Sequence, residues 1–145
     1  ITRGDKSYSI RIWGADTPEI RQICKDAGSN IVACGQQARD VAVRLIGGKP
    51  LSCEIKALDK HYNRVVGKCT TAAGKDLGKE LVRMGYAYPE EHSDDYIDDQ
   101  AYAEDHKLGL WAGKEFMNPK DWRNACMAGP RGQNRPEYCR ALNKK

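Results

Sequence analysis

Apolar and polar positions alternate over residues 8–13, a period of two that predicts a β-strand. The strand leads into residues 14–19, where Pro18 fixes the backbone and predicts a turn. We expect residues 20–33 to form a loop. Over residues 36–46 the apolar positions fall on one face with helical spacing, and a glycine doublet ends the pattern, so this segment is predicted to be a helix.

Two further strands are predicted at residues 51–57 and 64–70, on either side of a loop. In a hairpin centred on that loop, Cys53 lies opposite Cys69. Directly opposed residues can meet the geometry of a disulfide when they form a non-hydrogen-bonded pair. The hairpin therefore favours a covalent link across its two strands.

Helices are also predicted at residues 76–84 and 93–107, the first with Asp76 as its N-cap and Gly85 as its end. The resulting order is strand, helix, hairpin, helix, helix. This order predicts an α+β fold in which three helices pack on a small antiparallel β-barrel. The order of elements does not by itself identify a function.

Charge is distributed unevenly along the 145 residues. Residues 1–112 carry 16 Lys and Arg against 17 Asp and Glu, whereas residues 113–145 carry 8 against 3. We therefore expect one domain at 1–112 and a basic C-terminal extension at 113–145 that is closed by a disulfide and packs on it. Residues 90–105 hold eight acidic side chains, which we interpret as a solvated helix face.

The six cysteines fall into three locally spaced pairs, although the sequence leaves other pairings open. The pairs are Cys24 and Cys34, Cys53 and Cys69, and Cys126 and Cys139. None has the CxxC spacing of a zinc site, and the chain has only three His. Three disulfides predict an oxidising compartment, so the protein is expected to be secreted or periplasmic. No apolar run approaches the roughly 20 residues needed to span a bilayer, so no membrane insertion is expected.

Candidate chemistry gathers at the first strand and its turn. Arg11 lies on the strand, Asp16 and Glu19 lie on the turn, and Arg64 begins a later strand. Arginine is suited to a phosphoryl transition state because it is always charged and donates two parallel hydrogen bonds. Carboxylates can ligate a hard cation such as Ca²⁺ or orient an attacking water. Together these four groups would form a sufficient set for phosphodiester hydrolysis.

Four ordered motifs and a tail segment resemble the staphylococcal nuclease family and together cover residues 8–123. The family has an Arg five residues before an Asp-x-Pro-Glu turn, and here Arg11 precedes Asp16-Thr17-Pro18-Glu19 in the same way. The other matching segments are Tyr62-Asn63-Arg64, the helix motif at 76–87, Leu108-Gly109-Leu110-Trp111, and the bacterial-type tail with Phe116, Pro119, Asp121, Trp122 and Arg123. The resemblance implies a five-stranded barrel of the OB type.

The resemblance also implies a role for each matching position. Arg11 and Arg64 would bind the scissile phosphate, and Glu19 would be the general base. Asp16 would ligate Ca²⁺, or another divalent cation, through its side chain, and Thr17 would do so through its carbonyl. Tyr62 would contact a substrate phosphate. The implied activity is cleavage of DNA, RNA or both to 3′-phosphorylated products, by endonuclease or exonuclease action, with no obligate protein partner.

The chain departs from the family pattern at its start. The family has another metal-ligating Asp about fourteen residues before the strand Arg, and counting back from Arg11 runs past Ile1. We therefore expect the first barrel strand to be missing from this chain, with an open sheet edge where it would pair. In the hairpin loop, Asp59 lies slightly too early to match the family's Asp.

Two other functions compete with a cation-dependent nuclease. A catalytically inactive nuclease-like module would bind nucleic acid or a protein partner, but such modules commonly lose a catalytic residue, and all four are present here. A disulfide-linked secreted binding protein would account for the cysteines and for none of the motifs. The sequence therefore favours the enzyme.

Overall fold

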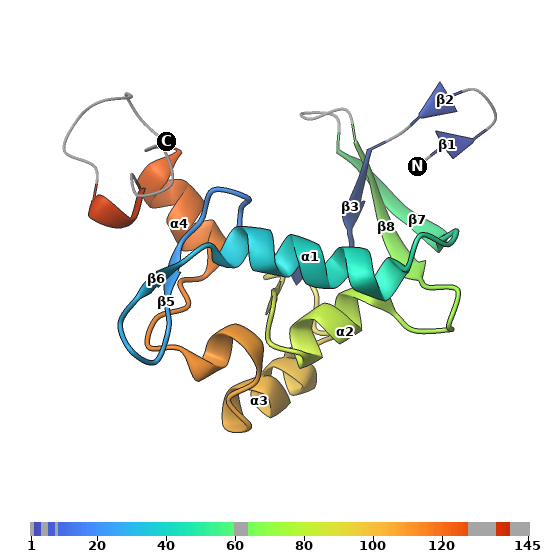
Figure 1. Cartoon of the computed structure of the whole chain (residues 1–145). Helices are drawn as coiled ribbons and strands as arrows, with labels where there is room; N and C mark the ends of the chain where they lie inside the picture. The colour runs from blue at the N-terminus through green and yellow to red at the C-terminus, as the bar shows by residue number, and fades with distance from the viewer. Residues whose placement is uncertain (1, 4–5, 8, 60–63, 128–135, 140–145) are drawn as a thin grey trace.

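Figure 1 shows the computed structural model, which describes residues 2–3, 6–7, 9–59, 64–127 and 136–139. The architecture is mixed α+β, as predicted (Figure 1). A small sheet lies near the C-terminal end of the long helix α1 (Cys34–Ile46); two shorter helices lie below α1 in this view, and the last helix lies at the upper left. No helix in the described part of the chain combines the length and the apolar character needed to cross a membrane.

The helices of the described residues are α1 (Cys34–Ile46), α2 (Leu77–Arg83), α3 (Ile97–Asp105) and α4 (Pro119–Cys126), with two 3-10 turns, η1 (Gly109–Ala112) and η2 (Glu137–Cys139). The first three confirm the predicted helices. The fourth was not predicted, because the sequence of the C-terminal extension was interpreted as having no clear periodicity. Its start was nevertheless signalled, since Asn118 caps it and Pro119 occupies its first turn.

The strands are β1 (Thr2–Arg3), β2 (Lys6–Ser7), β3 (Ile10–Ile12), β4 (Ala15–Asp16), β5 (Cys24–Lys25), β6 (Ile31–Val32), β7 (Ser52–Asp59), β8 (Arg64–Thr70) and β9 (Tyr88–Pro89). The largest sheet has the order β3-β8-β7, in which β7 and β8 form the predicted antiparallel hairpin and β3 runs parallel to β8. The other sheets pair β1 with β2, β4 with β9, and β5 with β6.

A closed five-stranded barrel, expected from the resemblance, is not present among the described residues. There, β7 pairs with β8 on one side and has no strand on the other, while β1 and β2 pair with each other. The apolar side chains of Ile55 and Leu58 are consequently exposed on β7. Without a partner for that edge, the curved sheet cannot close on itself.

The main core packs α1 and α2 against the strand–turn segment that carries the candidate site. Its fully or nearly buried members are Ala15, Val41, Leu77, Leu81, Val82, Ala87 and Tyr96. As predicted, Asp76 caps α2 by accepting a hydrogen bond from the Lys79 amide. The Tyr96 hydroxyl donates to both oxygens of Asp76, and its burial and this contact raise the pKa of Tyr96. Tyr96, which precedes α3, thereby holds the side chain that caps α2.

The acidic stretch at 90–105 is not simply a solvated face, so that interpretation was wrong in part. Its helix begins at Ile97, later than predicted, and Asp99 on it is only 4% exposed. Asp99 forms ion pairs with Lys79 and Arg83 of α2. A nearly buried carboxylate needs such partners because desolvation penalises an isolated charge. Charge pairing therefore joins α3 to α2.

The three disulfides join the predicted pairs, Cys24 with Cys34, Cys53 with Cys69, and Cys126 with Cys139. Cys53 and Cys69 are direct partners in the β7–β8 register, as the hairpin predicted. The first disulfide ties the β5–β6 hairpin to the start of α1, within the segment expected to be a loop. Each loop that these bonds close lowers the entropy of the unfolded chain.

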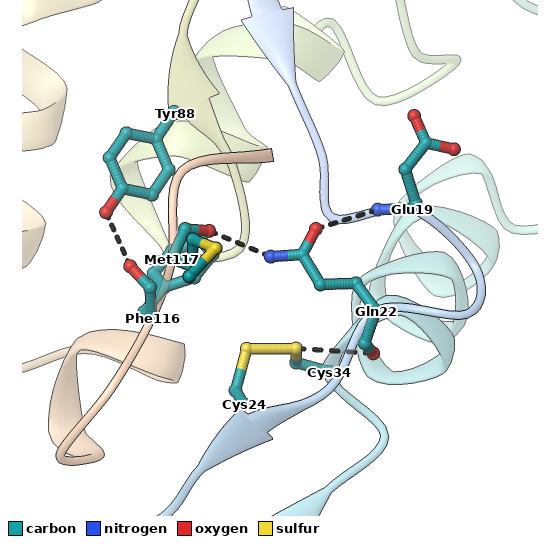
Figure 2. The surroundings of a disulfide bond; sticks show 7 residues. All are labelled: Glu19, Gln22, Cys24, Cys34, Tyr88, Phe116 and Met117. Atoms are coloured by element: carbon teal, nitrogen blue, oxygen red, sulfur yellow. Dashed lines mark hydrogen bonds between the residues drawn. A yellow bond between two sulfur atoms is a disulfide. The ribbon is translucent and has the colours of Figure 1, made fainter. Parts of the chain in front are cut away.

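Gln22 links the candidate turn to the C-terminal extension, as Figure 2 shows. Its side chain is fully buried; the amide oxygen accepts from the backbone N–H of Glu19 at 3.2 Å, and the amide nitrogen donates to the Met117 carbonyl at 2.8 Å. Its own carbonyl lies beside the Sγ of Cys34 and accepts from the Gly35 amide. Through its side chain and its backbone carbonyl, Gln22 thus joins the turn to the start of α1 and to the segment before α4.

We predict that Gln22→Met will lower the free energy of unfolding, because it leaves the partly buried Glu19 amide and Met117 carbonyl without the partner they have in the native protein. Each orphaned group should cost about 1–3 kcal/mol. Urea unfolding of the two proteins measures the difference. Gln36→Met is the matched control, since Gln36 is exposed on α1 and should change stability little. Equal losses in both variants would contradict the bridging role of Gln22.

Candidate active site

Five residues chosen from the sequence line a single cleft of about 1030 Å³. They are Arg11, Asp16, Thr17, Glu19 and Arg64. They come from three places in the chain, namely β3, the segment from β4 into the turn, and the start of β8. Tyr62, the expected phosphate contact, lies outside the described residues. The fold therefore brings together the set that the sequence singled out, Tyr62 aside.

The two arginines share a face of the sheet. In the parallel register, Arg11 pairs with Val66, and Arg64 lies two residues before Val66 on β8. Side chains alternate along a strand, so Arg64 and Val66 project from the same face, and Arg11 beside Val66 does too. The two side chains are both partly exposed, at 36% for Arg11 and 34% for Arg64. Both can therefore meet a ligand in the cleft.

Each of these arginines is held by a carboxylate from a neighbouring element. Arg11 forms an ion pair with Glu90, which also accepts from the Gly14 amide at 3.3 Å and is only 12% exposed. Arg64 donates to Asp59 at 3.0 Å, its direct partner across the β7–β8 register. Such charge-assisted contacts fix the direction of a flexible side chain. The arginines are thus oriented without any ligand.

A third arginine, Arg123 on α4, binds the two candidate carboxylates. Its Nη2 donates to Asp16 Oδ2 at 2.7 Å, and its Nη1 donates at 3.0 Å both to Asp16 Oδ1 and to Glu19 Oε1. The hydrogen bond to Asp16 raises the pKa of Arg123 above its ordinary value, against the effect of burial. The expected cation ligand and the expected base are therefore joined through one guanidinium.

The charges in and around this cleft nearly balance. Four arginines line the cleft, and each is paired with at least one carboxylate; they are Arg11, Arg39, Arg64 and Arg123. The mixture can bind a phosphate through guanidinium groups and place a carboxylate near the attacking water. These are the two requirements of phosphodiester hydrolysis that the side chains themselves can meet.

The donor chemistry near the turn fits a hard cation. Asp16, Thr17 and Glu19 offer carboxylate and carbonyl oxygens on the cleft wall, the ligand type that Ca²⁺ prefers. In the part of the chain that the structure describes, no group of three or more acidic, His or Cys side chains is arranged to hold a metal ion. These residues therefore supply only part of the six to eight oxygens that Ca²⁺ takes.

Sequence reasoning missed Glu90, Gln22 and the position of Arg123, and it passed over Asp59. Glu90 was grouped with the acidic stretch, and Arg123 appeared only as part of a tail motif. Neither carried a local signal, because its partners lie 79 and 107 residues away, respectively. Asp59 did carry a signal: the hairpin register that paired Cys53 with Cys69 could have placed it near Arg64.

A cluster of three aromatic side chains anchors the extension. Tyr88, Trp111 and Phe116 pack with ring centroids 4.8–5.1 Å apart, and the Tyr88 hydroxyl donates to the Phe116 carbonyl at 2.6 Å. Burial, with smaller effects of Glu104 and Asp121, raises the pKa of Tyr88 to about 12. Phe116 and Trp122 are both buried, so the extension packs on the rest of the chain.

Known proteins support this description. The family described as staphylococcal nuclease homologue matches residues 9–113. The chain is 28% identical over 133 residues to the succinoglycan biosynthesis protein ExoI of Rhizobium meliloti, covering 90% of this chain and 65% of that protein. It is 27% identical over 126 residues to an uncharacterized endonuclease of Haemophilus influenzae, covering 85% and 64%.

A probable staphylococcal-like nuclease, CAN3 of Oryza sativa, is 27% identical over 123 residues, which is 81% of this chain and 29% of that protein. The chain thus spans somewhat less than two thirds of the first two relatives and a smaller share of the third. The family match covers most of the chain and includes every position of the described site except Arg123. By that match, the chain belongs to the staphylococcal nuclease homologue family.

Proposed function

We propose that this protein is a divalent-cation-dependent nuclease that hydrolyses DNA, RNA or both to 3′-phosphorylated products. The observation that carries the proposal is the meeting of Arg11, Arg64, Asp16 and Glu19 in one cleft. Relatives named as endonucleases and nucleases support the same activity class. The phosphodiester backbone is the substrate chemistry that two fixed guanidinium groups recognise.

In this mechanism the arginines bind the non-bridging oxygens of the scissile phosphate. Pairing with Glu90 engages one amino group of Arg11, and a guanidinium carries five N–H donors, so Arg11 can hold Glu90 and phosphate together. Arg64 approaches from the adjacent strand on the same face. Negative charge grows on these oxygens in the transition state, so preoriented donors stabilise it more than the substrate.

Glu19 acts as the base in this mechanism. The water oxygen forms a bond to phosphorus while the bond from phosphorus to the 5′-oxygen breaks. The water's proton passes to Glu19, and the 5′-oxygen takes a proton from solvent, leaving a 3′-phosphate and a 5′-hydroxyl. Glu19 is 35% exposed, so it is accessible to a water in the cleft.

Asp16 and the Thr17 carbonyl are the proposed cation ligands, and a bound Ca²⁺ or similar ion would neutralise charge on the phosphate. Asp16 is 14% exposed and directed to the cleft, where its carboxylate faces Arg123. The three disulfides support an oxidising compartment, so we place the protein outside the cytoplasm, secreted or periplasmic.

We predict that Arg11→Ala and Arg64→Ala will each lower kcat/KM on single-stranded DNA or RNA by roughly 10²-fold or more in millimolar Ca²⁺, as expected for loss of a transition-state donor. Activity should stop in chelator. Arg11→Lys should recover little, because Lys keeps the charge and loses the planar fork.

Arg44→Ala is the matched control, since Arg44 is exposed on α1 away from the cleft and should retain full activity. Undiminished cleavage by the Arg11 and Arg64 variants would refute the assignment. Binding of single strands without cleavage in the native protein would instead support an inactive nucleic-acid-binding module.

The basic extension generates a separate prediction about substrate capture. Five of its basic residues lie outside the described residues, namely Arg131, Arg135, Arg140, Lys144 and Lys145. If they attract nucleic acid through counterion release, replacing all five with Gln should leave kcat unchanged, raise KM at low salt and flatten the dependence of binding on salt. Kinetics at several salt concentrations measure this. Unchanged KM and salt dependence would mean that these charges have no role in substrate capture and that the extension only packs on the rest of the chain.

A further inference from the structure

The contact between Arg123 and the two cleft carboxylates is unusually complete. Both oxygens of Asp16 and one oxygen of Glu19 accept hydrogen bonds from this one guanidinium. The side chains are largely shielded, with 29% of Arg123, 14% of Asp16 and 35% of Glu19 exposed. Screening by water and salt is reduced at such sites, so the pairing is stronger than one on the open surface.

The helix that carries Arg123 is also held firmly in place. On α4, Trp122 and Cys126 are buried, and Cys126 is bonded to Cys139. The segment before α4 is fastened by the hydrogen bonds of Gln22 to Met117 and of Tyr88 to the Phe116 carbonyl. The same Gln22 side chain accepts from the Glu19 amide. The helix that carries Arg123 and the turn that carries its carboxylate partners therefore belong to one framework.

We propose that Arg123 is an internal counter-cation that occupies the carboxylates of the cation site and competes with the divalent cation for them. The proposal rests on the proposed function, because it assigns the cation to Asp16. Ca²⁺ ligands lie at about 2.3–2.6 Å, so an ion on Asp16 would stand a few ångströms from a positive guanidinium. Like charges at that separation repel strongly in a partly shielded site. Binding of the ion therefore requires the guanidinium to withdraw.

The consequence is a site whose cation affinity is set by the C-terminal extension. Without the cation, the positive charge of Arg123 offsets the repulsion between the carboxylates of Asp16 and Glu19. With the cation, the ion takes over that role and Arg123 is released toward the cleft. The residue thus acts as a positioning residue in the cation-free protein and weakens cation affinity at the same time.

The test measures Ca²⁺ binding by isothermal titration calorimetry, together with thermal unfolding in chelator and in Ca²⁺, on the full chain. Arg123→Gln should bind Ca²⁺ about tenfold more tightly or better, because charge-assisted hydrogen bonds that oppose binding are gone. Its melting temperature should fall in chelator and recover more on adding Ca²⁺ than that of the native chain. Arg123→Lys should lie between the two.

Lys120→Gln is the matched control. Lys120 lies one turn earlier on α4, pairs with Glu91 and is 47% exposed, so the variant removes the same charge without touching Asp16 or Glu19. It should leave Ca²⁺ affinity unchanged. Equal tightening by both variants would show a general charge effect and overturn the proposal, as would unchanged or weaker Ca²⁺ binding by Arg123→Gln.

The outcomes also separate this proposal from the proposed function. If the native chain binds Ca²⁺, Asp16→Asn abolishes binding and Arg123→Gln does not tighten it, the cation site stands and the competition is refuted. If neither the native chain nor Arg123→Gln binds Ca²⁺, both the cation site and the competition are wrong. If Arg123→Gln weakens nucleic-acid binding in chelator and leaves Ca²⁺ affinity unchanged, Arg123 is a substrate contact instead.

Discussion

The parallel pairing of β3 with β8 is the contact on which the candidate site depends, because it aligns two arginines that lie 53 residues apart in sequence. A register shift by one residue would turn one guanidinium to the opposite face of the sheet. The Cys53–Cys69 disulfide ties β7 to β8 beside this pairing, and the bulge between Ile55 and Ala57 adjusts the hairpin. Strand geometry, rather than local sequence, therefore determines whether both arginines reach one phosphate.

A second constraint acts on the turn that follows β3. Gly35, at the start of α1, lies so close to Glu19 that an added Cβ would fall 1.8 Å from the Glu19 carbonyl oxygen. With Gln22 and the Cys24–Cys34 disulfide, this close approach locks the turn against the first turn of α1. If Glu19 is the base, as proposed, it must be held within a fraction of an ångström, and these buried contacts would supply that rigidity.

The C-terminal extension joins the site directly instead of lying apart from it. Its aromatic side chain Phe116 completes a buried cluster, and its Arg123 reaches the carboxylates of the turn. Every arginine of the cleft has a carboxylate partner, so the cleft is ordered by charge pairing before any phosphate or cation binds. Under the proposed function, a phosphate or a cation would replace some of these ion pairs, so the relative strengths of the two kinds of contact would control binding.

The sequence by itself determined the elements whose signals are local. Four such signals each depend on residues close by in the sequence, and the structure contains the element that each predicted. They are the alternation before the turn, the helical period ending at Gly47, the Asp76 cap and the opposed cysteines of the hairpin. The motif that carries Arg11, Asp16 and Glu19 could also be identified from the sequence alone. The gathering of these residues into one cleft with Arg64 followed from the family resemblance.

Only the tertiary structure decided which charges pair. The charged partners of Arg11, Asp16 and Glu19 lie 79 or more positions away, and nothing in their local sequence distinguishes Glu90 or Arg123 from other surface charges. Likewise, the burial of Gln22 depends on segments that meet only after folding. Local propensity acts over a few residues, whereas ion pairing and desolvation act through space, so these contacts are set by the packing of distant elements.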